Sequence, residues 1–297
     1  MIQFNQRRIK FGGIMKALIV GLATIVGGLG TVYDKGLGQS SSEVGYAEVC
    51  SDGGYDYNEQ GPYGHKYAGQ LGRFKIYVPR DFGEEGCTYP VVGFAPGIVS
   101  PTGLYSHFFK QLTSWGFVVV VDTNIAVNIT ARGLTGALEK IYKEANYKDH
   151  LAPKAGILGH SMGGGAVINA NGRKIVSSIV ALQPGPLGLT ATTKPTLFLG
   201  GTADFFGVFT RPNGRYKMAK GPRFLAVLEG GRHISDSFGP GKGSKRSKLY
   251  KGAFTGWFKC TLAGDRRACD LFKQSHKDSC ELPGQWALCQ GAKLDKI

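Results

Sequence analysis

One pentapeptide constrains the fold of this chain more than any other feature: Gly159-His160-Ser161-Met162-Gly163. A short apolar run, residues 156–158, precedes it, and a segment of small residues, 163–170, follows it. A serine on so sharp a strand-to-helix turn takes strained backbone angles, and the flanking glycines let the chain pass without side-chain clashes. Its hydroxyl then stands over a helix N-terminus, which favours developing negative charge. The motif therefore predicts that Ser161 is a nucleophile.

Short apolar segments rich in β-branched residues alternate with helical segments along the chain. Continuous apolar strands separated by helices are typical of a mostly parallel central sheet with helices on both faces. We therefore predict the α/β class and, with the serine motif, the α/β-hydrolase fold. The predicted strands are residues 74–78, 91–95, 117–122, 156–158, 175–182, 196–199 and 224–228. The predicted helices are residues 104–115, 134–146, 162–171 and 249–262.

The chain has 297 residues, which suits one large domain between two terminal segments. Residues 1–30 combine a basic start with a short, glycine-broken apolar stretch, as in a signal peptide; a retained N-terminal anchor is the alternative. We expect an N-terminal leader over residues 31–66, the α/β-hydrolase domain over 67–262, and a cysteine-rich extension over 263–297 packed on that domain. The expected location is extracellular, without stable membrane insertion.

Six cysteines agree with export to an oxidising compartment, because four of them fall in the last 38 residues. A zinc site is the rival interpretation. The gaps between those four are eight to ten residues, however, and no C-x-x-C pair occurs, so disulfides are favoured and no metal is expected. The net charge of +15 comes without a nucleic-acid-binding signature, so we predict a solvated basic surface and no nucleic-acid partner.

A serine nucleophile needs a base and an orienting carboxylate, which follow in the chain order Ser, Asp or Glu, His in α/β-hydrolases. His233 lies in a glycine loop just after an apolar strand, whereas His276 lies in a charged tail between cysteines. Asp204 ends a glycine turn after the preceding strand. We predict Ser161, Asp204 and His233 as the catalytic residues. The other carboxylates considered are Asp122, Asp236 and Glu229.

The same chemistry needs two backbone N–H groups for the oxyanion. One is predicted at Met162, directly after the nucleophile, and the other at Ile98, in the loop after residues 91–95. His160 is next to the nucleophile, but its side chain should point away from Ser161 on such a turn. We therefore expect it to line the pocket or pack. No cofactor is implied.

At these residues the chain resembles the cutinase-like polyesterases that include the bacterial PET hydrolases. The resemblance rests on GHSMGGG, on the turn Ala95-Pro96-Gly97, on Asp122-Thr123-Asn124 and on the spacing to Asp204 and His233. Plant chlorophyllases and lipase-like hydrolases share part of the pattern. The resemblance implies an open cleft without a lid, a monomer, the same triad and oxyanion amides, and hydrolysis of cutin-like or synthetic polyesters. It also implies a disulfide between Cys269 and Cys289.

The chain departs from this family at two aromatic positions. Ile98 stands where the family has an aromatic residue, and Leu187 is the nearest counterpart of its tryptophan. Phe205 and Phe206 are the substitutes we expect in the substrate site, with Ile98, His160 and Leu187. The function predicted is a secreted serine esterase that acts through an acyl-enzyme. The alternatives are a lipase or chlorophyllase-like esterase for small or lipid esters, and a non-catalytic surface-binding protein.

Overall fold

The computed structural model describes residues 56–83, 86–124, 126, 130–188, 190–207, 212–237, 243–273 and 280–297. All of them belong to the unit Gly45–Ile297. The predicted signal peptide, the leader before residue 56, Cys50 and His276 lie outside the described residues. No helix within the described ranges is long and apolar enough to cross a membrane.

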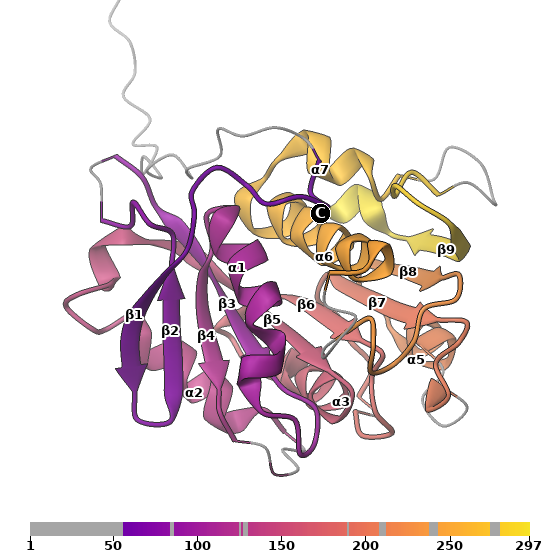
Figure 1. Cartoon of the computed structure of the whole chain (residues 1–297), viewed down its shortest axis with the longest axis horizontal. Helices are drawn as coiled ribbons and strands as arrows, with labels where there is room; N and C mark the ends of the chain where they lie inside the picture. The colour runs from indigo at the N-terminus through magenta and orange to yellow at the C-terminus, as the bar shows by residue number, and fades with distance from the viewer. Residues whose placement is uncertain are drawn as a thin grey trace, which may run out of the picture. The chain divides into compact units, whose positions relative to one another are not determined.

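The described residues form a nine-stranded sheet at the centre of this unit, in the order β1-β2-β4-β3-β5-β6-β7-β8-β9 (Figure 1). The pairs from β4 through β3, β5, β6, β7 and β8 are parallel, and the remaining pairs at the two edges are antiparallel. The strands are β1 (Lys66–Leu71), β2 (Phe74–Val78), β3 (Tyr89–Ala95), β4 (Val118–Asp122), β5 (Leu151–His160), β6 (Val176–Leu182), β7 (Thr196–Gly201), β8 (Arg223–Leu228) and β9 (Trp286–Ala292). The predicted mostly parallel sheet is confirmed.

Helices cover both faces of the sheet, as the α/β-hydrolase fold requires (Figure 1). They are α1 (Ser106–Ser114), α2 (Arg132–Ile141), α3 (Met162–Asn169), α5 (Pro212–Met218), α6 (Lys245–Ala263) and α7 (Arg266–Asp270). Short 3-10 turns are η1 (Thr102–Tyr105), η2 (Lys148–His150), η3 (Ala170–Gly172) and η5 (Leu294–Lys296). The predicted fold class is confirmed.

The alternation of side chains along the strands explains this layering. Val119 and Val121 of β4 pack in one cluster with α1 and α6, whereas Val118 and Val120 pack in another with α2 and α3. Successive side chains of a strand point to opposite faces, so a run of valines is buried on both sides. β4 ends at Asp122, whose carboxylate binds Arg73 at 2.8 Å.

Helix α6 begins four residues before the predicted helix because a capping residue lies upstream of the apolar pattern. The Ser244 hydroxyl accepts a hydrogen bond from the Ser247 amide, which satisfies one N–H group of the first turn. The helix ends at Ala263, and the following Gly264 takes the left-handed conformation (φ 71°) that a glycine after a helix adopts readily.

Both sheet edges contain strands that the sequence did not predict. β1 is interrupted by a register shift between Tyr67 and Gly69, and β9 is poor in β-branched residues. β9 belongs to the segment 263–297 and pairs antiparallel with β8. Edge strands of this kind have weak local propensity, because their pairing is decided by the neighbour that they meet.

The predicted Cys269–Cys289 disulfide is wrong, although disulfides in the C-terminal segment are confirmed. Cys269 is bonded to Cys260, and Cys289 is bonded to Cys280. The turn at Gly264 folds α7 back against α6, which places the Cα atoms of Cys260 and Cys269 4.7 Å apart. Each cysteine forms one disulfide, so the two local bridges exclude the longer one. Cys87 is also disulfide-bonded.

Candidate active site

Ser161 stands on the turn between β5 and α3 with φ 55° and ψ −122°, a conformation that costs a non-glycine residue energy. The flanking glycines are required by contact. A Cβ atom on Gly159 would lie 2.2 Å from the Gly163 carbonyl oxygen, and one on Gly163 would lie 2.2 Å from the Ala95 carbonyl oxygen. The pattern of glycines around Ser161 therefore follows from the close passage of β3, the turn and α3.

Backbone hydrogen bonds hold this strained turn in place. The Ser161 amide donates to the Leu182 carbonyl at 3.1 Å, at the end of β6. The Ser161 carbonyl accepts from the amides of Gly165 and Gly185, at 3.0 and 2.5 Å. These hydrogen bonds connect Ser161 to β6, to α3 and to the loop after β6. They stabilise a backbone conformation that is unfavourable for a serine.

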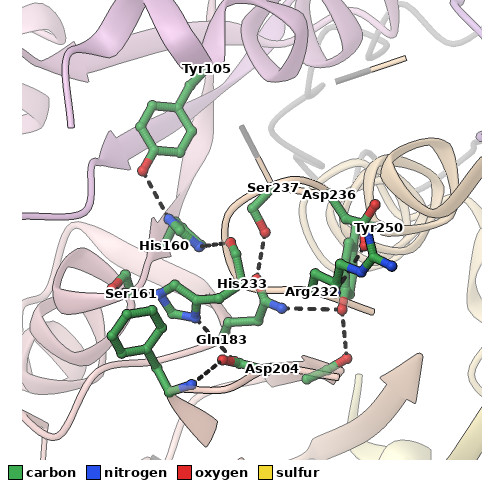
Figure 2. A network of polar contacts seen from close by, with 12 residues as sticks. Tyr105, His160, Ser161, Gln183, Asp204, Arg232, His233, Asp236, Ser237 and Tyr250 are labelled. Carbon is green, nitrogen blue, oxygen red and sulfur yellow. Dashed lines mark hydrogen bonds and ion pairs between the residues drawn. The ribbon is translucent and has the colours of Figure 1, made fainter. Parts of the chain in front are cut away.

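His233 and Asp204 complete a hydrogen-bonded series with Ser161 (Figure 2). His233 Nε2 lies 2.9 Å from Ser161 Oγ, and His233 Nδ1 lies 3.0 Å from Asp204 Oδ2. The two partner side chains are 9% and 4% exposed, so the ion pair that would form on protonation is shielded from water. The structure therefore brings together the three residues predicted as catalytic.

Glycines also set the separation of the two loops that carry Asp204 and His233. A Cβ atom on Gly201 would lie 2.2 Å from the Gly231 carbonyl oxygen, so the loops pass each other in backbone contact. The Ala203 amide donates to the same carbonyl at 3.1 Å. The second oxygen of Asp204, Oδ1, accepts from the Phe206 amide at 2.9 Å, which orients the carboxylate toward the histidine.

The alternative acids on these loops are engaged elsewhere. Asp236 accepts a hydrogen bond from the Arg232 amide at 2.9 Å, a contact that closes the loop around His233. Glu229 accepts from the Thr202 hydroxyl at 3.1 Å. Both contacts are structural, and of the carboxylates considered Asp204 is the one bonded to His233.

A cavity of about 350 Å³ opens above the serine. Ile98 and Met162, the two predicted oxyanion donors, lie on its wall together with Ser161. Met162 is the first residue of α3, where a backbone N–H has no acceptor within the helix. The cavity is lined by Ile98, Ser100, His160, Ser161, Met162, Gly185, Pro186, Phe206, His233 and Ile234.

The predicted substrate residues divide into two groups. Ile98, His160 and Phe206 line the cavity, and the Phe206 ring lies 4.9 Å from the His233 ring. Leu187 and Phe205 are not among its lining residues; Phe205 is 83% exposed.

Two apolar lining residues, Pro186 and Ile234, were not singled out in the sequence. Ile234 directly follows the proposed base, and that position is the signal that could have indicated it.

Arg215 of α5 is a second feature that the sequence did not indicate. Its side chain is buried and donates hydrogen bonds to the carbonyl groups of Gly185 and Gly188. Burial lowers the pKa of Arg215. The guanidinium group therefore fastens both ends of the loop that carries Pro186 into the cavity wall.

The order of the sheet, the helices on both of its faces and the strand-to-helix turn at Ser161 are those of the α/β-hydrolase fold. A family model described as PET hydrolase-like matches residues 53–279. The chain belongs to the PET hydrolase-like family.

Three characterised proteins are similar to this chain over part of its length. A cutinase, est2 of Thermobifida alba, is 29% identical over 205 residues, 65% of each chain. Lipase 1 of Moraxella sp. (strain TA144) is 30% identical over 155 residues, 50% of this chain and 49% of the lipase. A bis(hydroxyethyl) terephthalate hydrolase of Streptomyces coelicolor (strain ATCC BAA-471 / A3(2) / M145) is 28% identical over 137 residues, 43% and 44% of the two chains. Each match thus spans less than two thirds of the relative.

Proposed function

We propose that this protein is a serine carboxylic ester hydrolase, with Ser161 as nucleophile, His233 as base and Asp204 as the group that orients the base. The observation that carries the proposal is the pair of hydrogen bonds at the His233 ring: Ser161 Oγ lies 2.9 Å from Nε2, and Asp204 Oδ2 lies 3.0 Å from Nδ1. A base within this distance of a hydroxyl can remove its proton as the hydroxyl attacks.

In the proposed reaction the acyl group is transferred twice, first to Ser161 and then to water. His233 Nε2 takes the proton from Ser161 Oγ, which bonds to the ester carbonyl carbon, and the carbonyl oxygen becomes an oxyanion facing the amides of Ile98 and Met162. The intermediate collapses, the bond to the alcohol oxygen breaks, and His233 returns the proton to the leaving alcohol. Water, deprotonated by His233, then attacks the acyl-serine. The carboxylic acid leaves, and Ser161 recovers its proton.

Cutin-like or synthetic polyesters are the substrates that we propose first. The family and the similarity to a cutinase and to a terephthalate ester hydrolase support this class. The cavity supports it further, because Ile98, Phe206 and Ile234 are 44–48% exposed and so present apolar surface beside the serine. We also propose a secreted monomer, and its disulfides support an oxidising environment.

A lipase-like esterase for small or lipid esters is the second candidate. The apolar part of the cavity wall is mostly aliphatic and includes Ile98, Met162, Pro186 and Ile234. Among the described lining residues, Phe206 is the one with a phenyl ring. A wall of this kind suits an acyl chain as well as a flat ring. Similarity to a lipase adds to this alternative.

The first experiment compares release of acid from an insoluble polyester film with hydrolysis of soluble p-nitrophenyl butyrate. Ser161→Ala should lower kcat for both by at least about a thousandfold, because loss of a triad member costs that much or more. Ser178→Ala removes another buried serine hydroxyl, bonded to Thr261 and outside the cavity wall, and should leave kcat within about twofold.

The outcomes separate the candidates. Activity on both substrates supports a polyesterase, and activity on the soluble ester alone supports the lipase-like alternative. Retention of activity in Ser161→Ala contradicts the assignment of the nucleophile. Absence of hydrolysis together with absence of labelling by a fluorophosphonate probe would instead indicate a non-catalytic surface-binding protein.

A further inference from the structure

A buried polar chain links the two loops on either side of Ser161, and its centre is His160 (Figure 2). His160 is the last residue of β5 and has no exposed surface. Its Nδ1 lies 2.8 Å from Tyr105 Oη, and its Nε2 lies 3.1 Å from the His233 carbonyl oxygen. Tyr105 Oη accepts a hydrogen bond from the Gly97 amide at 3.2 Å.

Burial gives the ring of His160 one protonation state. Desolvation, and then the nearby His233, lower the pKa of His160 well below its usual value of 6.5, outweighing its hydrogen bonds to the His233 carbonyl and to Gln183. The ring is therefore neutral and donates from one nitrogen only. Burial also raises the pKa of Tyr105 to about 12, so its hydroxyl keeps its proton.

These facts give a direction to the hydrogen bonds that run from Gly97 through Tyr105 and His160 to His233. A carbonyl oxygen can only accept, so the proton of His160 is on Nε2 and is donated to His233. Nδ1 is then an acceptor, and Tyr105 donates its hydroxyl proton to it. The same hydroxyl oxygen accepts from Gly97.

This series of hydrogen bonds ends at two backbone segments on which the proposed chemistry depends. Gly97 precedes Ile98, a proposed oxyanion donor, and a Cβ atom on Gly97 would lie 3.1 Å from Tyr105 Oη and 3.3 Å from Ser161 Cβ. The other end is the carbonyl of His233, whose ring is bonded to Ser161. His160 itself is covalently adjacent to Ser161.

We propose that Tyr105 and His160, the latter in the Nε2–H tautomer, form a positioning unit that fixes the Gly97-Ile98 turn and the His233 backbone relative to Ser161. The inference rests on the proposed ester hydrolase function. The unit touches no reacting atom. It sets the distance from the nucleophile to the oxyanion amide on one side and to the base on the other.

The first test is Tyr105→Phe, which keeps the ring and removes the shared hydroxyl. Removal of an oxyanion donor lowers kcat about a hundred- to a thousandfold, and displacement of a donor lowers it less. We therefore expect kcat on p-nitrophenyl butyrate to fall about ten- to a hundredfold. KM should stay within about twofold, since the apolar cavity wall is intact.

Tyr142→Phe is the matched control. Tyr142 donates its hydroxyl to the Ala152 carbonyl at 2.8 Å, near the start of the strand that ends at His160, and it lies outside the cavity wall. This variant loses a hydroxyl of the same kind and should lose stability without loss of kcat. An equal fall in kcat for both variants would overturn the proposal, because it would indicate general destabilisation.

Coupling between the two residues gives a second readout. If Tyr105 and His160 act as one unit, the variant that combines Tyr105→Phe with His160→Phe should be no more than about threefold slower than the slower single variant. Multiplication of the two single effects would contradict a shared role.

A third readout uses the unaltered protein and so does not depend on the folding of any variant. Nitrogen-15 NMR of the histidine rings at pH 7 should show His160 neutral, with the proton on Nε2. A proton on Nδ1 would overturn the proposal. Absence of ester hydrolysis in the unaltered protein would contradict the proposed function instead, and the tautomer measurement would still decide the hydrogen-bond directions.

Discussion

Gly163 offers a direct test of how the serine turn is built. A Cβ atom on this residue would lie 2.2 Å from the Ala95 carbonyl oxygen and 2.4 Å from the Pro96 carbonyl oxygen. Both separations are well under 3.0 Å, a distance below which Cβ atoms are hardly ever found. The obstructing atoms are backbone, so no side-chain rotation relieves the overlap, and Gly163→Ala must push the end of β3 away from α3.

The cost of this displacement is large for one methyl group. Overpacking of a close-packed interior costs about 1–3 kcal/mol when side chains can adjust, and here the backbone must move, so we expect at least about 3 kcal/mol. For a folded unit of this size 1 kcal/mol corresponds to about 2–4 °C in Tm, so Tm should fall by about 6–12 °C. The moving segment leads into Gly97 and Ile98, and kcat should fall about a hundredfold, as for a misplacement near 1 Å.

Thermal unfolding and kcat on p-nitrophenyl butyrate measure the two effects. The control is Gly136→Ala on the exposed face of α2, where a Cβ atom would meet nothing within 4 Å. Alanine in a helix interior should stabilise this variant by about 0.5–1 kcal/mol and leave kcat unchanged. If Gly163→Ala unfolds within about 1 °C of the unaltered protein and keeps its kcat, the steric account of the serine turn is wrong.

Two further predictions concern the disulfides and pH. Peptide mapping without reduction should recover Cys260 joined to Cys269, and recovery of a Cys269–Cys289 peptide would refute the pairing. Replacing both cysteines by serine should lower the free energy of unfolding, measured in urea, by about 2–3 kcal/mol. The loss is expected because the disulfide restricts the entropy of a loop with a sequence separation of nine residues in the unfolded chain. Because folding lowers the pKa of His160, the unfolded chain binds a proton below pH 6.5 that the folded protein excludes, so Tm should fall as the pH drops through 6.5. His160→Phe should flatten this part of the Tm profile, and an unchanged slope would show that His160 does not contribute to it.

The three residues that we propose as catalytic, which the structure brings together, each have a local signal in the sequence. Ser161 is marked by two glycines, and His233 and Asp204 each follow an apolar strand and a glycine turn. Because parallel strands end at the same edge of a sheet, residues that follow them meet there. The strands and helices of the centre were predictable for a related reason, since runs such as the valines of β4 are buried on both faces.

The parts that were missed depend on contacts between distant segments. β9 has no strong strand pattern, and its pairing with β8 exists only once the chain has folded back. The Cys269–Cys289 pairing failed because α7 turns back onto α6 at Gly264. Arg215 lies 30 residues from Gly185 in the chain, and nothing near it in the sequence indicates that it binds that loop.

The sequence by itself determined the class of fold, the three residues proposed as catalytic with their order along the chain, and the use of disulfides. Each of these depends on a short segment of the sequence, because backbone strain and burial act on neighbouring residues. Tertiary structure alone decided which cysteines pair, which apolar side chains line the cavity, and that Tyr105 reaches His160 across 55 positions. These contacts depend on distances between segments, and such distances exist only after the sheet and its helices have packed.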